Sequence, residues 1–391
     1  MKRFPALLTT VFVAVAFLGA TPVCAGIKDN MTNYLYKRKA VKAIESYVDN
    51  TVLKSIDLFV EDTESLNQAV MKLKKDKNDD NLAAANKVWH KTLSSFNRCT
   101  IFFYGPVAYY DYNKALALNP FDKILVDHAL GEMKAGKLSL TSITLRERTA
   151  SMRGLYTARY MMFRNGKPRK AAEINTTELE YLTAVTGAMV EESLEFQASW
   201  VGTENMPSDK AALLKNAGIK SYTSYAREFK NPGEPYSRYL SVSVPLQELI
   251  QESTTVIEDM VPAIKNLSEY DENDISYWES LDPYAELLDL LKGVENSYMG
   301  GIEGSRGTSF SELVAAKDKV LDDRIKTAFA HTAKRIETIR SLKDAPKEKK
   351  EMAIKIAASE TEKLASRMMV ATPLVTADPA VEPFGPYGSD L

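Results

Sequence analysis

The chain has 391 residues, of which 45% are hydrophobic and 26% are charged, as is usual for a globular protein with a sizeable core. A chain of this length forms roughly two to three domains. The 50 Lys and Arg residues nearly balance the 52 Asp and Glu residues, so the formal net charge is −2. This balance provides no general electrostatic attraction to nucleic acids or to anionic membranes.

The N-terminus has the three parts of a secretory signal peptide. Met1–Arg3 supplies positive charge, Ala6–Ala20 is almost uninterruptedly apolar, and Val23–Ala25 places small residues before the expected cleavage site. We therefore expect residues 1–25 to be removed on export. The apolar run is too short for a stable membrane span, and no other stretch is long and apolar enough, so the mature chain is expected to have none. Cys24 leaves lipid modification as an open alternative.

Apolar residues recur at helical spacing along most of the chain. In chain order we expect helices over Met31–Leu73, Asn81–Ile101, Phe121–Gly136, Ser151–Arg164, Thr176–Trp200, Leu246–Leu267, Pro283–Val294, Ser309–Leu342 and Glu348–Met368. Strand patterns are nearly absent, and the short alternating run Ser241–Val244 stands alone between helical neighbours. The sequence therefore predicts an all-α protein with two successive helical bundles.

The polar stretch Glu228–Pro235, EFKNPGEP, is the expected boundary between the bundles. The N-terminal bundle then covers residues 26–230, and the C-terminal bundle covers residues 235–371. Residues 372–391 contain several prolines and are expected to form an extended, disordered tail.

One predicted helix carries unusual chemistry on its polar flank. In Ser151–Arg169, SMRGLYTARYMMFRNGKPR, Tyr156 and Arg159 lie about one helical turn apart and point the same way. Arg153 is expected one turn before Tyr156 on the same flank. These three side chains would offer hydrogen bonds and positive charge to an anionic or aromatic group. The competing interpretation is that Arg159 only pairs with a carboxylate across the bundle.

Few residues are candidates for a metal centre. Of three histidines, only His128 lies one helical turn from a carboxylate in a suitable pattern, that of Glu132. Such i,i+4 pairs are common on solvated helices, so a divalent metal such as iron or zinc at these residues is an alternative hypothesis. The Gly300–Gly307 loop lacks the Gly-Lys-Ser/Thr ending of a phosphate-binding loop, and we interpret it as an interhelical or substrate-lining loop.

Several segments, in the same order along the chain, resemble the imelysin family of exported bacterial proteins, first described as insulin-cleaving membrane proteases. The segments are Ala84–Val107, with its helical Trp and Phe-x-x-Gly-Pro close, Arg153–Arg169, Trp278-Glu279-Ser280 with Asp289, Asn296–Gly301 and Ser309–Phe329. The resemblance implies two helical bundles with a G-x-H-x-x-E signature near their junction. It also implies a place in the periplasm or on the outer membrane and an association with iron uptake. In the family, the His and Glu of the signature are taken as a metal-binding or peptidase-like centre.

The signature is degenerate at the two positions that carry chemistry. Gly154 matches the motif glycine, whereas Tyr156 stands at the His position and Arg159 at the Glu position. A neutral imidazole and a carboxylate can share a divalent cation, but a phenol with a pKa of about 10 and a permanent guanidinium charge are poorly suited to do so.

We therefore expect an exported cell-envelope protein that is not an enzyme and has no cofactor. It would bind a small anionic ligand or an unknown envelope protein at the cleft between the bundles, with Arg153, Tyr156 and Arg159 as candidate contacts. Nucleic acid is not an expected partner. The alternative is a metal-binding protein or metallopeptidase of the imelysin family with ligands outside the signature, such as His128 and Glu132.

Overall fold

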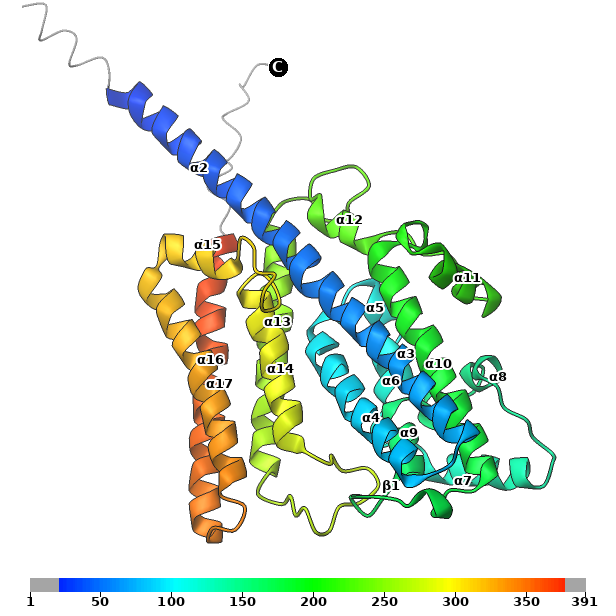
Figure 1. Ribbon diagram of the computed structural model, residues 1–391. Helices are drawn as coiled ribbons and strands as arrows, with labels where there is room; N and C mark the ends of the chain where they lie inside the picture. The colour runs from blue at the N-terminus through cyan, green and yellow to red at the C-terminus, as the bar shows by residue number, and fades with distance from the viewer. Residues whose placement is uncertain (1–20, 377–391) are drawn as a thin grey trace, which may run out of the picture.

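The computed structural model describes residues 21–376, with the side chains of residues 33–105 and 108–376. Within these residues the chain is helical apart from short connections and one two-stranded hairpin. The helices form two bundles that lie side by side (Figure 1). The predicted fold class is thereby confirmed. No helix in residues 21–376 combines the length and apolar content that crossing a membrane requires.

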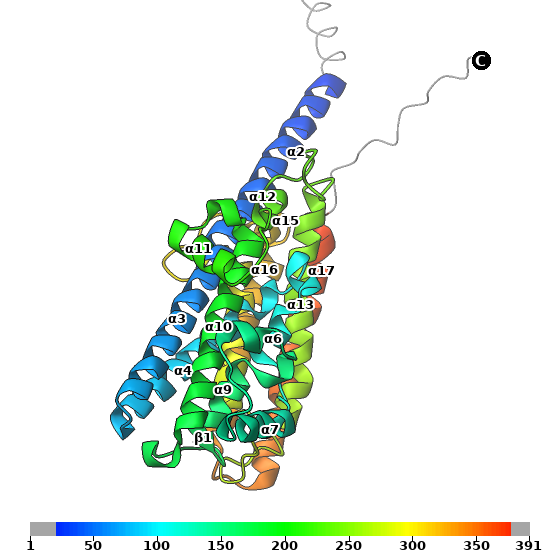
Figure 2. The same ribbon diagram turned by 90° about the vertical axis from the view of Figure 1, so that its right-hand side faces the viewer.

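The first bundle is organised around one continuous helical path. Helix α2 (Thr21–Ser46) passes through a π-helical segment η1 (Tyr47–Val52) into α3 (Leu53–Lys75), and the three form a single rod in side view (Figure 2). Helix α4 (Asp79–Cys99) returns along α3, and α10 (Thr176–Val201) packs on the other side of α3. The predicted cap of α10 is present, because the Asn175 side chain accepts a hydrogen bond from the Glu178 N–H at 2.9 Å.

Shorter elements complete the first bundle. Between α4 and α10 they are η2 (Thr100–Phe102), α5 (Pro106–Tyr109), α6 (Tyr112–Ala117), α7 (Lys123–Lys134), α8 (Ser142–Arg146), η3 (Ala150–Met152), α9 (Leu155–Met162), β1 (Phe163–Arg164), β2 (Lys167–Pro168) and η4 (Ala171–Glu173). After α10 come η5 (Thr203–Asn205), α11 (Ser208–Asn216) and α12 (Tyr225–Lys230). The boundary predicted at residues 230–235 falls in the loop after α12.

The second bundle contains α13 (Ser243–Asn266), α14 (Pro283–Tyr298), α15 (Phe310–Lys317), α16 (Lys319–Ser341) and α17 (Lys347–Thr376). Helix α13 packs against α14 and α17, and α16 packs against α17. The prediction of a single helix over residues 309–342 is wrong. Asp318 leaves the helical conformation and its carboxylate accepts the Leu321 N–H at 2.9 Å, so it ends α15 and caps α16.

The ends of the chain only partly overlap the described residues. Helix α17 continues through Pro373 to Thr376, beyond the predicted helix end at Met368, so the prediction of an extended tail is wrong for residues 372–376. The remainder of the predicted tail, residues 377–391, lies outside the described residues, as do residues 1–20 of the predicted signal peptide.

The two bundles are docked through α4 and α14. The helices approach so closely at Gly293 that a Cβ atom there would lie 2.6 Å from the backbone oxygen of Arg98. The Arg98 guanidinium also forms a 2.8 Å ion pair with Asp289 of α14. Buried apolar residues of both bundles belong to one continuous core. The bundles therefore share a packed interface rather than a flexible linker alone.

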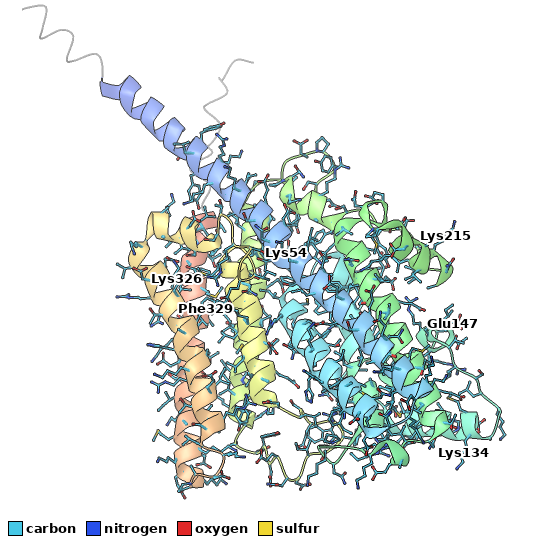
Figure 3. All side chains as sticks on the ribbon, viewed as in Figure 1. Lys54, Lys134, Glu147, Lys215, Lys326 and Phe329 are labelled. Atoms are coloured by element: carbon cyan, nitrogen blue, oxygen red, sulfur yellow. The ribbon has the colours of Figure 1, made fainter. Side chains whose placement is uncertain are left out.

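The glycine-rich loop after α14 adds a second contact between the bundles. The Ile302 N–H donates to the backbone oxygen of Asn50 at 2.9 Å, and Lys54, labelled in Figure 3, donates to Ser305 Oγ at 2.7 Å. A Cβ atom at Gly307 would lie 2.5 Å from Ser46 Oγ. This loop therefore packs against the π-helical segment of the first bundle.

We expect Gly293→Ala to lower the free energy of unfolding by about 2 kcal/mol, because the added methyl group must push α14 away from α4. Gly131→Ala is the matched control, since no atom lies within 4 Å of the new Cβ on α7. That change should leave stability unchanged or raise it by up to about 1 kcal/mol through helix propensity. Urea unfolding of the three proteins measures the difference, and equal effects would contradict close docking at Gly293.

Candidate functional site

The signature segment folds into a short buried helix followed by a hairpin. Gly154 has a φ of 89°, and a Cβ atom there would lie 2.6 Å from the backbone oxygen of Leu116, so glycine is required at this position. Helix α9 then buries all of its residues. It ends at Met162, earlier than expected, and the Asn165-Gly166 pair forms the turn between β1 and β2 rather than the end of the helix.

Arg159 joins α9 to the loop that connects α13 and α14. Its side chain is only 3% exposed, and its guanidinium donates to the backbone oxygens of Tyr277 and Glu279 and, at 3.4 Å, to that of Ser276. Figure 1 shows this loop reaching across from the second bundle to β1 of the first. Burial lowers the pKa of Arg159, but an arginine remains charged at neutral pH. The main partners of Arg159 are thus carbonyl oxygens rather than a carboxylate.

Tyr156 and Glu286 lie beside Arg159. The Tyr156 side chain is 7% exposed, and its ring centroid is 5.7 Å from the Arg159 Cζ atom. Burial, followed by the charge of Glu286, raises the pKa of the Tyr156 phenol. Glu286 of α14 is partly buried and accepts a 2.6 Å hydrogen bond from Ser280 Oγ. We call Tyr156, Arg159, Ser280 and Glu286 the junction cluster.

Burial also raises the pKa of Glu286, from its ordinary value of 4.5 to about 7, against the opposing effects of the Ser280 hydrogen bond and the Arg159 charge. The junction cluster therefore offers a protonated phenol, a guanidinium and one carboxyl group that resists ionisation. This donor set does not fit a divalent cation, which requires deprotonated oxygen, nitrogen or sulfur ligands.

The other predicted metal ligands do not form a built site. His128 is exposed on α7, and Glu132 of the same helix lies 3.8 Å from Lys137 Nζ in an ion pair. Among the residues that the structure describes, no three His, Cys, Asp or Glu side chains come together so that they could hold a metal ion.

Arg153 is separated from Tyr156 and Arg159. It follows η3 in an extended conformation before α9 begins, so the expected helical spacing does not apply to it. Its Nε donates to Glu192 Oε1 of α10 at 2.5 Å, and another nitrogen donates to the Arg148 backbone oxygen at 2.6 Å. Arg153 thus points toward the first bundle, while Arg159 bonds to the second.

Tyr156 and Arg159 line two different cavities. Tyr156 lines a cavity of about 530 Å³ between α6, α9 and α13, together with Glu252 and Asp259 of α13. Arg159 lines a cavity of about 330 Å³, which we call the junction cavity. The residues lining the junction cavity are Lys123, Arg159, Tyr160, Phe163, Arg164, Asn165, Gly166, Ser276, Tyr277, Trp278 and Leu281.

Sequence reasoning missed most of the residues that line the junction cavity. The i,i+4 spacing of Tyr160 and Arg164 was a usable signal, and the Arg164 Cζ atom indeed lies 3.9 Å from the Tyr160 ring centroid. Tyr277 and Trp278 are an aromatic pair inside a polar loop, which is a weaker sequence signal of a binding site. Nothing in the sequence showed that this loop meets α9.

These features define a class of all-α protein with two docked bundles. A short buried helix that follows a glycine in the first bundle is hydrogen-bonded to a loop of the second. The sequence model of the imelysin family matches residues 52–368, and the chain belongs to this family. No curated protein sequence matches the chain at a significant level.

Two crystal structures have the same fold. One is a protein assigned as an iron-regulated protein A precursor from Parabacteroides distasonis, with a TM-score of 0.67 and 17% identity over 88% of this chain and 96% of that one. The other is an imelysin-like protein from Psychrobacter arcticum, with a TM-score of 0.55 and 12% identity over 87% of this chain and 93% of that one. At these identities the likeness establishes the shared fold.

The raised pKa of Glu286 makes stability fall as pH rises. Between its unfolded value of 4.5 and its folded value of about 7, the folded protein binds more protons than the unfolded chain, so stability is lost across this window. Glu286→Gln mimics the protonated form and removes this loss. We expect the melting temperature of the variant minus that of the parent protein to be larger at about pH 8 than at about pH 5. Glu192, whose pKa is also raised to about 7, is present in both proteins and cancels. A difference that does not change with pH would contradict the account.

Proposed function

We propose that the protein is an exported, non-catalytic member of the imelysin family that binds a small anionic ligand at the junction between α9 and the loop connecting α13 and α14. The observation that carries this proposal is the position of Arg159. A buried guanidinium stands where the family signature has its carboxylate, and its N–H groups are bonded to loop carbonyls.

The chemistry of these side chains supports the proposed absence of peptidase activity. A metallopeptidase needs a cation that keeps an open position for water and lowers the pKa of that water. At the junction, the fixed positive charge of Arg159 repels a cation, and Tyr156 holds its proton because its pKa is raised. The same residues support binding and positioning but supply no activated water.

The anionic character of the ligand follows from the lining of the junction cavity. Lys123, Arg159 and Arg164 contribute positive charge, and no Asp or Glu is among the lining residues. Two carboxylates outside this lining pair with its cations: Asp127 forms a 2.5 Å ion pair with Lys123, and Glu178 lies 3.4 Å from the Arg164 guanidinium. An anion would therefore enter a cavity whose walls carry net positive charge.

Export and a link to iron are parts of the same proposal. The pattern of residues 1–25 supports export, and the structural relative from Parabacteroides is itself described as an iron-regulated precursor. The proposed role is therefore binding of an anionic ligand in the cell envelope within an iron-linked process, with an envelope protein as the alternative partner.

Metal analysis of the purified protein tests the proposal. We expect no stoichiometric iron or zinc and no metal-dependent peptide hydrolysis. Stoichiometric metal that disappears in His128→Ala would contradict the proposal and support a metallopeptidase with ligands outside the signature.

Restoring the signature should create metal affinity. In Tyr156→His combined with Arg159→Glu, an imidazole and a carboxylate would face Glu286, giving three ligands for a divalent cation. Val320→His is the control, because it places a histidine three residues before Asp323 on an exposed part of α16 without a third ligand. Zinc titration of folded variants, verified by circular dichroism, should show binding only for the double variant. Equal affinity in both variants, or no gain, would argue against the mapping of the signature.

A further inference from the structure

The junction cavity combines positive charge with aromatic walls. Its lining contains three cationic side chains and four aromatic ones, Tyr160, Phe163, Tyr277 and Trp278. Tyr160 and Phe163 are buried and belong to the first bundle, whereas Tyr277 and Trp278 come from the loop that Arg159 bonds. The cavity thus has one aromatic wall on each side of the junction.

Arg164 is the cation best placed to meet a ligand. Its guanidinium stacks on Tyr160 with Cζ 3.9 Å from the ring centroid and donates to the Phe163 backbone oxygen at 3.1 Å. Its carboxylate neighbour, Glu178, lies 3.4 Å away but is held more closely by Arg169, at 2.7 Å. The side chain is about one-third exposed. A planar guanidinium held in this way can bind a carboxylate through two parallel hydrogen bonds.

The loop wall presents aromatic surface to solvent. Trp278 is 47% exposed and Tyr277 is 39% exposed, whereas Trp89 and Trp200 are completely buried. The Tyr277 ring lies 5.3 Å from that of Phe121, but no aromatic or cation–π contact of Trp278 is found among the described residues. A half-exposed indole at the wall of a cavity provides apolar area and a ring face for a planar ligand.

We propose that the junction cavity binds a small aromatic carboxylate, with the carboxylate at Arg164 and Lys123 and the ring against Trp278 and Tyr277. This inference rests on the proposed binding role of the junction and names the chemical class of the ligand. The volume of about 330 Å³ is at the small end of ligand cavities, so it suits a ligand with one ring. The three cations disfavour an aromatic amine of the same size.

Calorimetric titration with four probes separates the contributions of charge and ring. Benzoate carries both features, cyclohexanecarboxylate keeps the charge without the aromatic ring, and benzylamine and benzyl alcohol keep the ring without the negative charge. We expect benzoate to bind at least about tenfold more tightly than the other three, since charge and stacking each contribute a comparable part of the affinity.

Single-residue variants test whether benzoate binds in the junction cavity. Arg164→Gln and Trp278→Ala should each weaken benzoate binding by about tenfold or more. Arg227→Gln is the matched control, because Arg227 stacks on Tyr236 with Cζ 4.1 Å from the ring centroid, on α12 and outside the lining of the cavity. This control variant should bind benzoate as the parent protein does.

Several outcomes would overturn the inference: no benzoate binding at millimolar concentration, equal binding of cyclohexanecarboxylate or benzylamine, or equal loss in the Arg227 control. Failure here is distinguishable from failure of the proposed function. A protein that is free of metal and peptidase activity but does not bind benzoate overturns only the ligand class. Stoichiometric catalytic metal overturns the proposed function itself.

Discussion

A guanidinium buried between two bundles must have its charge and its N–H donors satisfied. Arg159 meets this requirement with backbone oxygens from Ser276, Tyr277 and Glu279, which belong to the other bundle. The loop between α13 and α14 is therefore held against α9, and with it Tyr277 and Trp278 are held at the edge of the junction cavity. These hydrogen bonds help to fix the shape of that cavity, together with the packing of Tyr277 against Phe121.

Under the proposed function, the same position accounts for how the family fold persists without a bound metal. A divalent cation and a guanidinium both bring positive charge to oxygen atoms from two parts of a chain. The guanidinium has a fixed planar set of donors and no open coordination position, so it holds structure but cannot activate water. The charge of Arg159 lowers the pKa of nearby Glu286, but burial has the larger effect and raises this pKa to about 7. The junction cluster links the two bundles through Arg159, and its donor set does not fit a divalent cation.

The fold was largely predictable because long helices leave clear sequence signals, namely apolar residues at helical spacing and capping residues at the ends. Thr176–Val201 follows its predicted cap at Asn175, and the expected all-α class is confirmed. Local signals failed where a single residue changes the path of the chain. Asp318 is compatible with a continuous amphipathic pattern, yet it interrupts the helix and caps the next one. The sequence predicts a helix that continues to Arg164, whereas Phe163 and Arg164 form β1, because two-residue strands are too short to show alternation.

The site was less predictable for a physical reason. Helical spacing correctly placed Tyr156 and Arg159 near each other, but it could not show that they line different cavities. The prediction that Arg153 lies on the same helical flank as Tyr156 was wrong, because Gly154 breaks the helical geometry just before α9. Tyr277 and Trp278 come from a loop, and the position of a loop depends on the tertiary contacts that hold it rather than on its own sequence.

Amide hydrogen exchange of the segment 276–280 tests the central claim most directly, measured in the parent protein with and without a metal chelator and in Arg159→Gln. If a guanidinium rather than a metal holds the loop, exchange of this segment is unchanged by the chelator and becomes faster in the variant, while exchange in α10 stays the same. Faster exchange on addition of the chelator, or unchanged exchange in Arg159→Gln, would contradict the account.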